Sequence, residues 1–317
     1  MKNNIKCRID EIKAKYDKWN VESFKCDPYP RSGGVLFVTV DKYGSFYVTP
    51  NHGTEIGVYS KEGKFINKID KFNFKGRKPV SPFGLAYNEQ NNYLLINDLW
   101  NLKIHLYDLN QNLIIKTFSY PKINQNKEKL VPSYLMPKDN NDLYYVGDVI
   151  FLSIVKVDES YYVLGREFKD AKEANKIQIT RINEQLDYID EYLSFDCSER
   201  EANLNHDIAY SAVDCHIYFL QSGRYIYSYE IGSKEKKLIF DADKYNYQLS
   251  SIHVVNDNIY ATNINPIKGS LVKISCQGEF IYNFDHEEIN GPTCVTSHDD
   301  MIFIVSRANN KIVILSK

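Results

Sequence analysis

Five residues of this chain are of types that do acid–base, metal or anion chemistry, and each lies in a short polar segment beside an apolar run. They are His52, Asp98, His206, Asp207 and Arg224. Histidine and aspartate transfer protons and bind metal ions near neutral pH, and arginine clamps anions through paired N–H donors. If the fold brings the five side chains together, they form a catalytic or metal site with Arg224 as the anion clamp.

A second group of residues suits ligand binding without catalysis. Asn and Arg side chains can bind a polar or anionic ligand, while the indole of Trp100 can either stack on a ligand or pack a neighbouring loop. Polar side chains are also typical of any solvated loop. The candidate ligand-binding residues are Glu55, Asn97, Trp100, Arg166, Asn263 and Arg307.

A zinc site would require a cluster of histidines. His52, His206 and His253 come from separate parts of the chain and could approach one another in the fold. His253 stands inside the apolar run Ile252-His253-Val254, however, where a buried histidine that is hydrogen-bonded internally is the simpler interpretation. The remaining histidines are expected at strand or turn surfaces: His105, His216, His286 and His298.

Nucleophilic and phosphate-binding motifs are missing from the sequence. There is no Gly-x-Ser-x-Gly, no Gly-Lys-Ser/Thr and no Gly-x-Gly-x-x-Gly segment. The six cysteines include no Cys-x-x-Cys pair, so free thiols are expected. Cys197 lies beside Asp196, Glu199 and Glu201, and these carboxylates would raise its pKa and reduce its reactivity.

The elements that must position these residues form a repeating unit of four short apolar strands. Residues 35–66 show the unit first: an alternating strand, a tight turn, a second strand, a polar loop and two further strands. Residues 83–118 repeat the pattern. Four-strand units that recur about every 40–50 residues are typical of β-propellers.

Counting the units predicts an all-β, six-bladed β-propeller of four-stranded antiparallel blades, with residues 31–317 as one domain. The third unit is irregular, because the run Leu143–Val146 is surplus to four strands; residues 119–150 therefore contain an excursion between blades. The last unit ends one strand short, and Val21–Lys25 is the expected strand that closes it. Residues 1–30 thus supply a short N-terminal α-helix and the closing strand.

The helix prediction rests on apolar periodicity. Ile5, Ile9, Ile12, Tyr16 and Trp19 recur at spacings of four, three, four and three, which places them on one helical face. This face could dock on the propeller itself, or it could bind a partner or form a homo-oligomer.

Composition narrows the class of partner. The chain has 317 residues, 43% of them hydrophobic, and a net charge of −2. A near-neutral balance argues against nucleic-acid binding, which usually requires a basic surface. No apolar run approaches the ~18 residues of a membrane span, and the charged N-terminus does not resemble a signal peptide. We therefore expect a cytoplasmic protein without nucleic-acid or membrane partners.

Part of the chain resembles the NHL repeat. The segments Pro82–Tyr87, Tyr93–Asp98 and Lys103–Asp108 match the repeat's Pro-x-Gly-hydrophobic start, its strand ending in Asp and its Lys-Ile-x-hydrophobic strand. Weaker echoes occur in residues 44–66 and 291–314. The resemblance covers about half of the chain and places it among TolB-like and sugar-lactonase-like propellers, which include both protein-binding domains and enzymes.

The lactonase resemblance implies a calcium site made by one Glu, one Asp and two Asn from loops at the channel mouth. Asn97, Asp98, Asp207 and Asn263 occupy comparable places, but Arg31–Gly34 offers no Glu where the family has one. The amidating lyases of this superfamily carry zinc ligands that have no positional match here. Calcium or zinc at the mouth is therefore an open prediction.

The sequence favours a non-catalytic binding propeller that presents a polar channel mouth to a protein, a peptide or a small polar ligand. The alternative is a channel-mouth enzyme, either a metal-assisted hydrolase or lyase or a cyclase-like biosynthetic enzyme. Convergence of the candidate groups within hydrogen-bond or metal-ligand reach would favour the enzyme.

Overall fold

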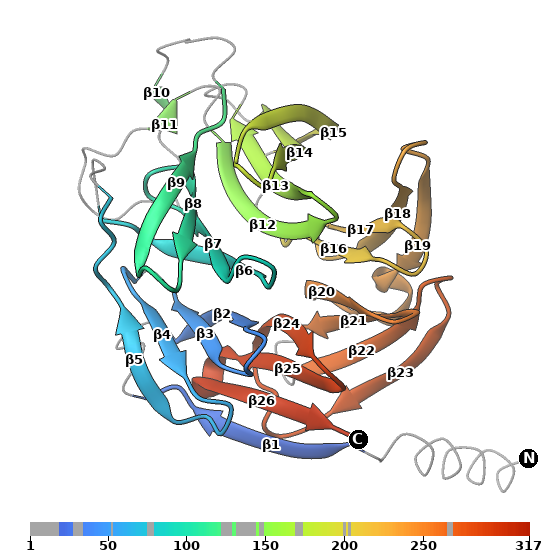
Figure 1. Ribbon diagram of the computed structural model, residues 1–317. Coiled ribbons are helices and arrows are strands. Elements are labelled where there is room, and N and C mark those ends of the chain that lie inside the picture. Colours follow the sequence, from blue (N-terminus) through green and yellow to red (C-terminus); the bar gives the residue numbers. More distant parts are fainter. Residues whose placement is uncertain are drawn as a thin grey trace, which may run out of the picture.

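Six four-stranded antiparallel sheets stand as blades around a central channel (Figure 1). This computed structural model describes residues 19–27, 34–51, 53–74, 79–121, 129–130, 144–145, 149–168, 174–198, 201, 204–264 and 269–317. The predicted six-bladed β-propeller of four-stranded antiparallel blades is therefore confirmed. Within the described residues, no helix is both long enough and apolar enough to cross a membrane.

Each blade begins at the channel, and its strands follow one another outward. The strands of blades 1, 2 and 3 are β2 (Val35–Val40), β3 (Phe46–Pro50), β4 (Ile56–Tyr59), β5 (Phe65–Ile69), β6 (Pro82–Asn88), β7 (Tyr93–Asp98), β8 (Lys103–Asp108), β9 (Leu113–Phe118), β12 (Val149–Val157), β13 (Ser160–Phe168), β14 (Ala174–Asn183) and β15 (Tyr188–Ser198). The strands of blades 4 and 5 are β16 (Asp207–Ser211), β17 (His216–Gln221), β18 (Tyr225–Glu230), β19 (Lys236–Asp241), β20 (Leu249–Val255), β21 (Asn258–Asn263), β22 (Ser270–Ser275) and β23 (Phe280–Asp285). Blade 6 contains β24 (Pro292–His298), β25 (Met301–Ser306), β26 (Lys311–Ser316) and β1 (Asn20–Lys25).

The surplus apolar run before blade 3 lies outside the blade. Its residues Tyr144–Tyr145 form β11, which pairs only with β10 (Lys129–Leu130) in a separate two-stranded sheet. The four strands of blade 3 begin at Val149, as expected once the surplus run is set aside. An excursion between blades 2 and 3 is thus confirmed.

The N-terminal strand closes the ring. β1 pairs antiparallel with β26, with Asn20 opposite Ser316 and Lys25 opposite Lys311. The ring of Phe24 also packs 5.1 Å from that of Phe46 in blade 1. The predicted closure by Val21–Lys25 is therefore confirmed, whereas the predicted helix falls mainly on residues 1–18, which lie outside the described residues.

Apolar side chains fill the seams between blades. In the seam between blades 4 and 5, for example, Leu220 and Ile226 pack with Ile252 and Ile259, and all four are buried. Burial of such a side chain contributes about 1.5–3 kcal/mol. Each blade is covered on both faces by its two neighbours. Its strands therefore carry apolar side chains on both faces of the sheet.

The innermost strands of five blades carry a β-bulge near their beginning. The ladder register shifts around Leu36 in β2, Phe83–Gly84 in β6, Leu152 in β12, Ser250 in β20 and Thr293 in β24. A bulge leaves a residue out of the ladder and bends the strand. Its carbonyl is then free to accept a hydrogen bond from a neighbouring blade.

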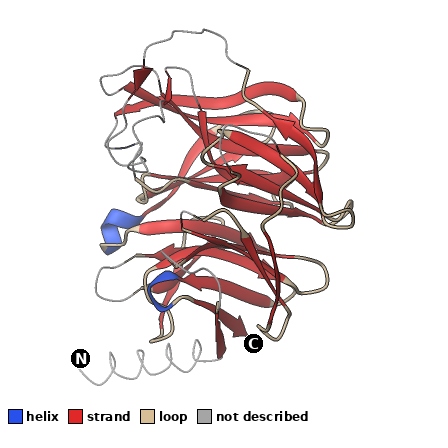
Figure 2. Ribbon diagram, turned by 90° about the vertical axis from the view of Figure 1, so that its left-hand side faces the viewer, coloured by secondary structure: helices blue, strands red, loops and turns tan. Residues whose placement is uncertain are grey.

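The ring has two different faces (Figure 2). The entry face carries the loops that lead into each innermost strand and the loops between second and third strands, including the short 3₁₀ helices η1 (Ala242–Tyr245) and η2 (Arg307–Asn309). The hairpin face carries the tight turns between first and second strands and between third and fourth strands. The ten candidate catalytic and ligand-binding residues that the structure describes come from the segments at the entry face.

Candidate functional site

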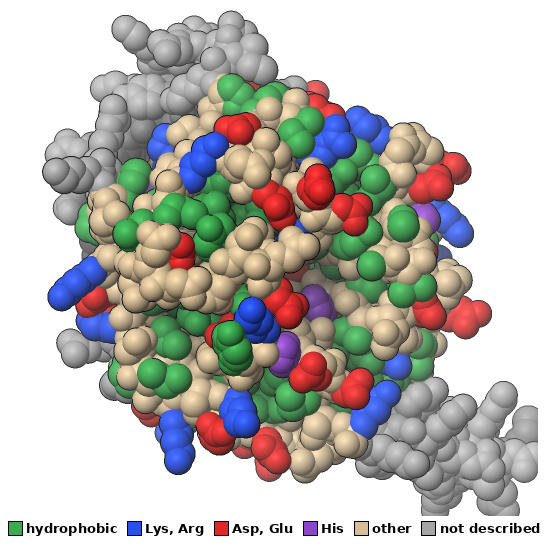
Figure 3. All heavy atoms as spheres, in the orientation of Figure 1, with side chains coloured by type: hydrophobic (Ala, Val, Ile, Leu, Met, Phe, Trp, Pro, Cys, Tyr) green, Lys and Arg blue, Asp and Glu red, His purple; other side chains and the backbone are tan. Residues whose placement is uncertain are grey.

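The central channel is lined by the innermost strand of every blade and has a volume of about 290 Å³. Each of these strands pairs on one side only, so its free edge of backbone N–H and C=O groups faces the channel. Figure 3, which views the hairpin face, shows a hollow at the centre with histidine and acidic side chains beside it. The volume is at the small end of the range for small-molecule sites.

Asp207 is buried at the start of β16 and links blade 4 to blade 5. One carboxylate oxygen accepts hydrogen bonds from Ser251 Oγ (2.7 Å) and from the Ile252 backbone N–H (2.9 Å). The other accepts from the Ile208 backbone N–H (2.9 Å). Burial raises the pKa of Asp207, although these hydrogen bonds and one from Ser153 of blade 3 oppose the rise. The carboxyl group therefore joins neighbouring innermost strands.

His253 lies near the other end of the channel. Its Nε2 is 2.8 Å from Ser297 Oγ of blade 6, and the channel leaves the side chain partly accessible. Desolvation deep inside the ring lowers the pKa of His253 to about 4, so the imidazole is neutral at pH 7. The prediction that His253 is hydrogen-bonded internally agrees with this contact, although the residue lines the channel instead of the apolar core.

His206 has both ring nitrogens in backbone hydrogen bonds. Its Nδ1 accepts from the Ser222 N–H (3.3 Å), and its Nε2 lies 2.9 Å from the Glu201 carbonyl oxygen, to which it donates. Burial lowers the pKa of His206 to about 4. Protonation would remove the acceptor at Nδ1, so the neutral ring holds the loop that precedes blade 4 and has no free nitrogen for a metal or a substrate.

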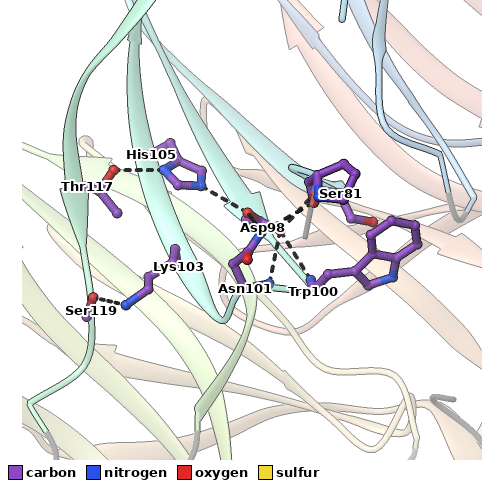
Figure 4. A network of polar contacts seen from close by, with 9 residues as sticks. Ser81, Asp98, Trp100, Asn101, Lys103, His105, Thr117 and Ser119 are labelled. Carbon is purple, nitrogen blue, oxygen red and sulfur yellow. Dashed lines mark hydrogen bonds and ion pairs between the residues drawn. The ribbon is translucent and has the colours of Figure 1, made fainter. Parts of the chain in front are cut away.

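Asp98 organises the turn after β7 (Figure 4). Its carboxylate accepts hydrogen bonds from the backbone N–H groups of Ser81 (3.0 Å), Trp100 (3.2 Å) and Asn101 (3.2 Å). It also contacts Asn101 Nδ2 at 2.6 Å and His105 Nε2 at 3.0 Å. The carboxylate is 0% exposed at its side chain, and its hydrogen-bonding capacity is used by the protein itself.

The prediction that His105 lies at a strand surface is wrong. The residue is 0% exposed: its Nε2 contacts Asp98, its Nδ1 contacts Thr117 Oγ1 at 2.9 Å, and its ring lies 4.5 Å from that of Phe74. Sequence alternation alone could not place it, because both faces of a blade are buried. In the β7–β8 ladder His105 lies opposite Ile96, with Asp98 as its diagonal neighbour, and that diagonal polar pair was the available signal.

Asn97 and Asn263 are both almost fully buried but differ in their contacts. Asn263 Oδ1 accepts from the Gln248 N–H (3.0 Å), and its Nδ2 donates to Ser270 Oγ (3.1 Å). Asn97 is 1% exposed, and among the described residues neither its Nδ2 nor its Oδ1 has a hydrogen-bond partner. Asn263 is therefore structural, whereas the amide of Asn97 is unsatisfied.

The other candidates are spread around the entry face. Exposed Arg224 lies 3.7 Å from Asp243, and Glu55 accepts from Lys68 Nζ at 3.1 Å. Arg307 is exposed at η2, in blade 6. Arg166 is buried beside His206, whose pKa its charge helps to lower. Glu55, Arg166, Arg224 and Arg307 thus come from four different blades, while His52 lies outside the described residues.

The part of the chain that the structure describes contains no group of three or more His, Cys, Asp or Glu side chains that could hold a metal ion. Of the four residues that the lactonase resemblance implies for calcium, Asp98, Asp207 and Asn263 accept hydrogen bonds from protein donors, and Asn97 has no partner among the described residues. Cys197 lies at the end of β15, and burial first, then nearby Glu201, raises its pKa to about 11. The low reactivity expected for Cys197 therefore has a second cause, burial, in addition to the neighbouring carboxylates.

Comparison with known proteins supports the fold class alone. No family model matches the chain, and no curated protein matches it by sequence. Virginiamycin B lyase from Staphylococcus aureus has a similar structure, with a TM-score of 0.60 and 12% identity over 95% of this chain and 100% of that one. A luciferin-regenerating enzyme gives 0.60 with 8% identity, covering 94% and 96% of the two chains. The Cps50 (Swd1) β-propeller domain of Myceliophteria thermophila gives 0.58 with 9% identity, covering 94% and 99%.

These similarities define the class as a six-bladed β-propeller. Two proteins named as enzymes and one named only as a β-propeller domain share the architecture at comparable TM-scores. Because a propeller scaffold carries many unrelated functions, the function must be argued from the residues of this chain.

Proposed function

We propose that this protein is a non-catalytic binding propeller that presents the polar mouth of its entry face to a protein, a peptide or a small polar ligand. The observation that carries the proposal is the internal use of the chemically capable groups. Asp98, His206 and Asp207 each bind several protein donors or acceptors, so none offers a free atom to a substrate.

Exposed residues around the mouth suit recognition. Arg224 and Arg307 are exposed at loops of blades 4 and 6, and partly buried Trp100 lies in the corresponding loop of blade 2. Tryptophan and arginine are the residue types that most often dominate binding energy at interfaces. A rigid ring that displays them on separate loops supports recognition of a ligand across the mouth. We place this activity in the cytoplasm and expect no nucleic acid or membrane as partner.

The enzyme alternative has less support. A metal-assisted hydrolase or lyase needs free ligands or an acid–base pair that converge on one point. Proteins that bear the names of a lyase and a regenerating enzyme share the fold, but at 12% identity or less they lend no residue roles to this chain.

A peptide selection tests the proposal. Peptides selected from a displayed random library against the wild-type protein should bind an Arg224→Ala/Arg307→Ala variant at least tenfold more weakly. A Lys42→Ala/Lys61→Ala variant, which removes the same charge from the hairpin face, should retain wild-type affinity. If binding follows the hairpin-face variant instead, or if the protein turns over lactone or ester substrates, the proposal is wrong.

Metal addition separates the two functions further. For protein stripped with a chelator, we expect added Ca²⁺ or Zn²⁺ to move the unfolding midpoint by less than about 1 °C, because a specifically bound ion would stabilise the folded state by mass action. A shift of several degrees that disappears in Asp98→Ala/Asp207→Ala would favour the metal-dependent enzyme.

A further inference from the structure

Hydrogen bonds from side chains to carbonyl oxygens fasten several seams near the entry face. In four of the six seams, a side chain of one blade donates to a carbonyl at the beginning of the next innermost strand. The bonds are Thr293 Oγ1 to Leu36 O (2.8 Å), Thr49 Oγ1 to Phe83 O (3.0 Å), Asn205 Nδ2 to Leu249 O (3.1 Å) and Ser250 Oγ to Pro292 O (2.7 Å). Each of these polar groups is satisfied within the protein.

The seam between blades 2 and 3 differs. Asn97 lies on β7 between Leu95 and Leu99, and side chains two residues apart share a face of a strand. Leu95 and Leu99 both pack against residues of blade 3, so Asn97 faces the same seam. The residue is 1% exposed, yet neither of its amide atoms has a hydrogen-bond partner in the part of the chain that the structure describes.

Two bulges pack closely around this amide. A Cβ atom added at Gly84, in the bulge of β6, would be 2.8 Å from Asn97 Nδ2 and 3.0 Å from the carbonyl oxygen of Leu152, in the bulge of β12. The glycine is therefore required for the close approach of the amide. An unpaired buried amide is costly, and native proteins rarely retain one without a partner.

An apolar and aromatic cluster adjoins the amide at the entry face. Leu99 and Ile150 are buried there, and four side chains that pack against them are only partly buried: Phe83, Trp100, Leu102 and Leu152. None of these six side chains carries a charge. A carboxylate or an ammonium group that packed against these six side chains would lose its hydration without gaining a counter-charge from any of them.

We propose that Asn97 anchors a neutral amide-binding site at the seam between blades 2 and 3. The ligand's amide C=O accepts from Asn97 Nδ2, its amide N–H donates to Asn97 Oδ1, and its apolar neighbour packs against Phe83 and Trp100. A peptide main chain supplies all three features. This inference rests on the proposed function, since it names the chemical group that the entry-face mouth recognises.

Three probes of similar size and different hydrogen bonding test the site. Isovaleramide has the amide donor and acceptor, N,N-dimethylisovaleramide lacks the donor, and isovalerate replaces the amide with a charge. In protein labelled with ¹⁵N-asparagine, the side-chain signal missing in Asn97→Leu identifies Asn97. Isovaleramide should shift this signal, and the two other probes should bind at least tenfold more weakly, because a site built for a hydrogen bond rejects an analogue that lacks it.

Variants separate binding from folding. Asn97→Leu replaces an unpaired amide with an apolar group in an apolar seam, so it should fold and bind isovaleramide at least tenfold more weakly. The matched control is Asn283→Leu in β23, which also removes a buried unpartnered amide oxygen and should bind as the wild type does. In a Trp19→Phe background, Trp100 is the one tryptophan left, and its fluorescence should change on addition of isovaleramide.

The outcomes distinguish the two proposals. Equal responses to all three probes, or no response of the Asn97 signal, would overturn the amide site; an internal water seen by a cross-peak to Asn97 without probe binding would do the same. If selected peptides depend on Arg224 and Arg307 but bind Asn97→Leu normally, the amide site is wrong and the binding function stands. Loss of dependence on all three residues would reject both.

Discussion

Asp207 has a structural role in the ring and no catalytic role, so its replacement by alanine should destabilise the folded protein. The change removes the acceptor of hydrogen bonds from Ser153, from Ser251 Oγ and from the backbone N–H groups of Ile208 and Ile252. Each buried donor left without a partner costs about 1–3 kcal/mol. Partial relaxation brings the expected loss in the free energy of unfolding to about 3–5 kcal/mol, which corresponds to a fall in Tm of roughly 4–8 °C for a chain of this length.

Equilibrium urea unfolding, followed by circular dichroism and by tryptophan fluorescence, measures this loss. Asp207→Asn should lose less, about 1–2 kcal/mol, because its carbonyl oxygen still accepts from part of the donor set. Asp257→Ala, at an exposed turn on the hairpin face, is the control and should change stability by less than about 0.5 kcal/mol.

The pH dependence gives an independent check. Burial raises the pKa of Asp207 in the folded state above its ordinary value near 3.9. The folded state therefore holds this proton more tightly, so the stability contribution of the carboxyl group is complete below about pH 3.9 and is lost as the pH rises through the folded-state pKa. The advantage of the wild type over Asp207→Asn should shrink as the pH is raised from about 4.

Two results would refute the reasoning. If Asp207→Ala unfolds within about 1 kcal/mol of the wild type, the carboxyl group does not hold the blades together. If the variant keeps its stability but loses ligand binding, Asp207 belongs to a functional site, and the enzyme alternative returns.

Three further changes have defined outcomes. His206 has a folded-state pKa of about 4 against an ordinary value near 6.5. The free energy of unfolding of the wild type should therefore fall by on the order of 2–3 kcal/mol as the pH falls from about 6.5 to 4. Urea unfolding at several pH values should show a smaller fall in His206→Gln. Phe24→Ala should cost about 3 kcal/mol, because Phe24 packs on the rings of Phe46 and Tyr59; an unchanged Tm would show that closure by β1 does not depend on this side chain. Asp98→Ala should lower Tm by several degrees through loss of the turn after β7, and a variant as stable as the wild type would contradict the structural role assigned to that carboxylate.

Local patterns in the sequence were enough to predict the blades. Short apolar strands joined by tight polar turns, several of which contain Gly or Asn, define the hairpins by short-range chemistry. Counting these strands also predicted that Val21–Lys25 completes blade 6, because a ring with one strand missing would leave an open edge. The surplus strand before blade 3 was recognised for the same reason.

The candidate site was predicted by residue type but not by role. The candidates that the structure describes lie in segments at the entry face, as a strand-by-strand count requires. Whether Asp98 was a free carboxylate or the centre of a turn depended on Ser81, Trp100, Asn101 and His105, which surround it only after blade 2 has formed. The partners of Asp98 come from several segments of blade 2, so the pattern could not show which of its atoms remain free.

The sequence by itself determined the class of fold, the number of blades and the strand that closes the ring, because these follow from local periodicity and from the need to pair every edge. Only the tertiary structure decided which polar groups are satisfied. Asp207 finds partners on the neighbouring blade, and His206 and Asn263 find theirs in other segments of their own blades. Asn97 is equally polar and equally buried but finds no partner among the described residues. Hydrogen bonding between segments far apart in the chain depends on distances of a few tenths of an ångström, and only the assembled ring sets those distances.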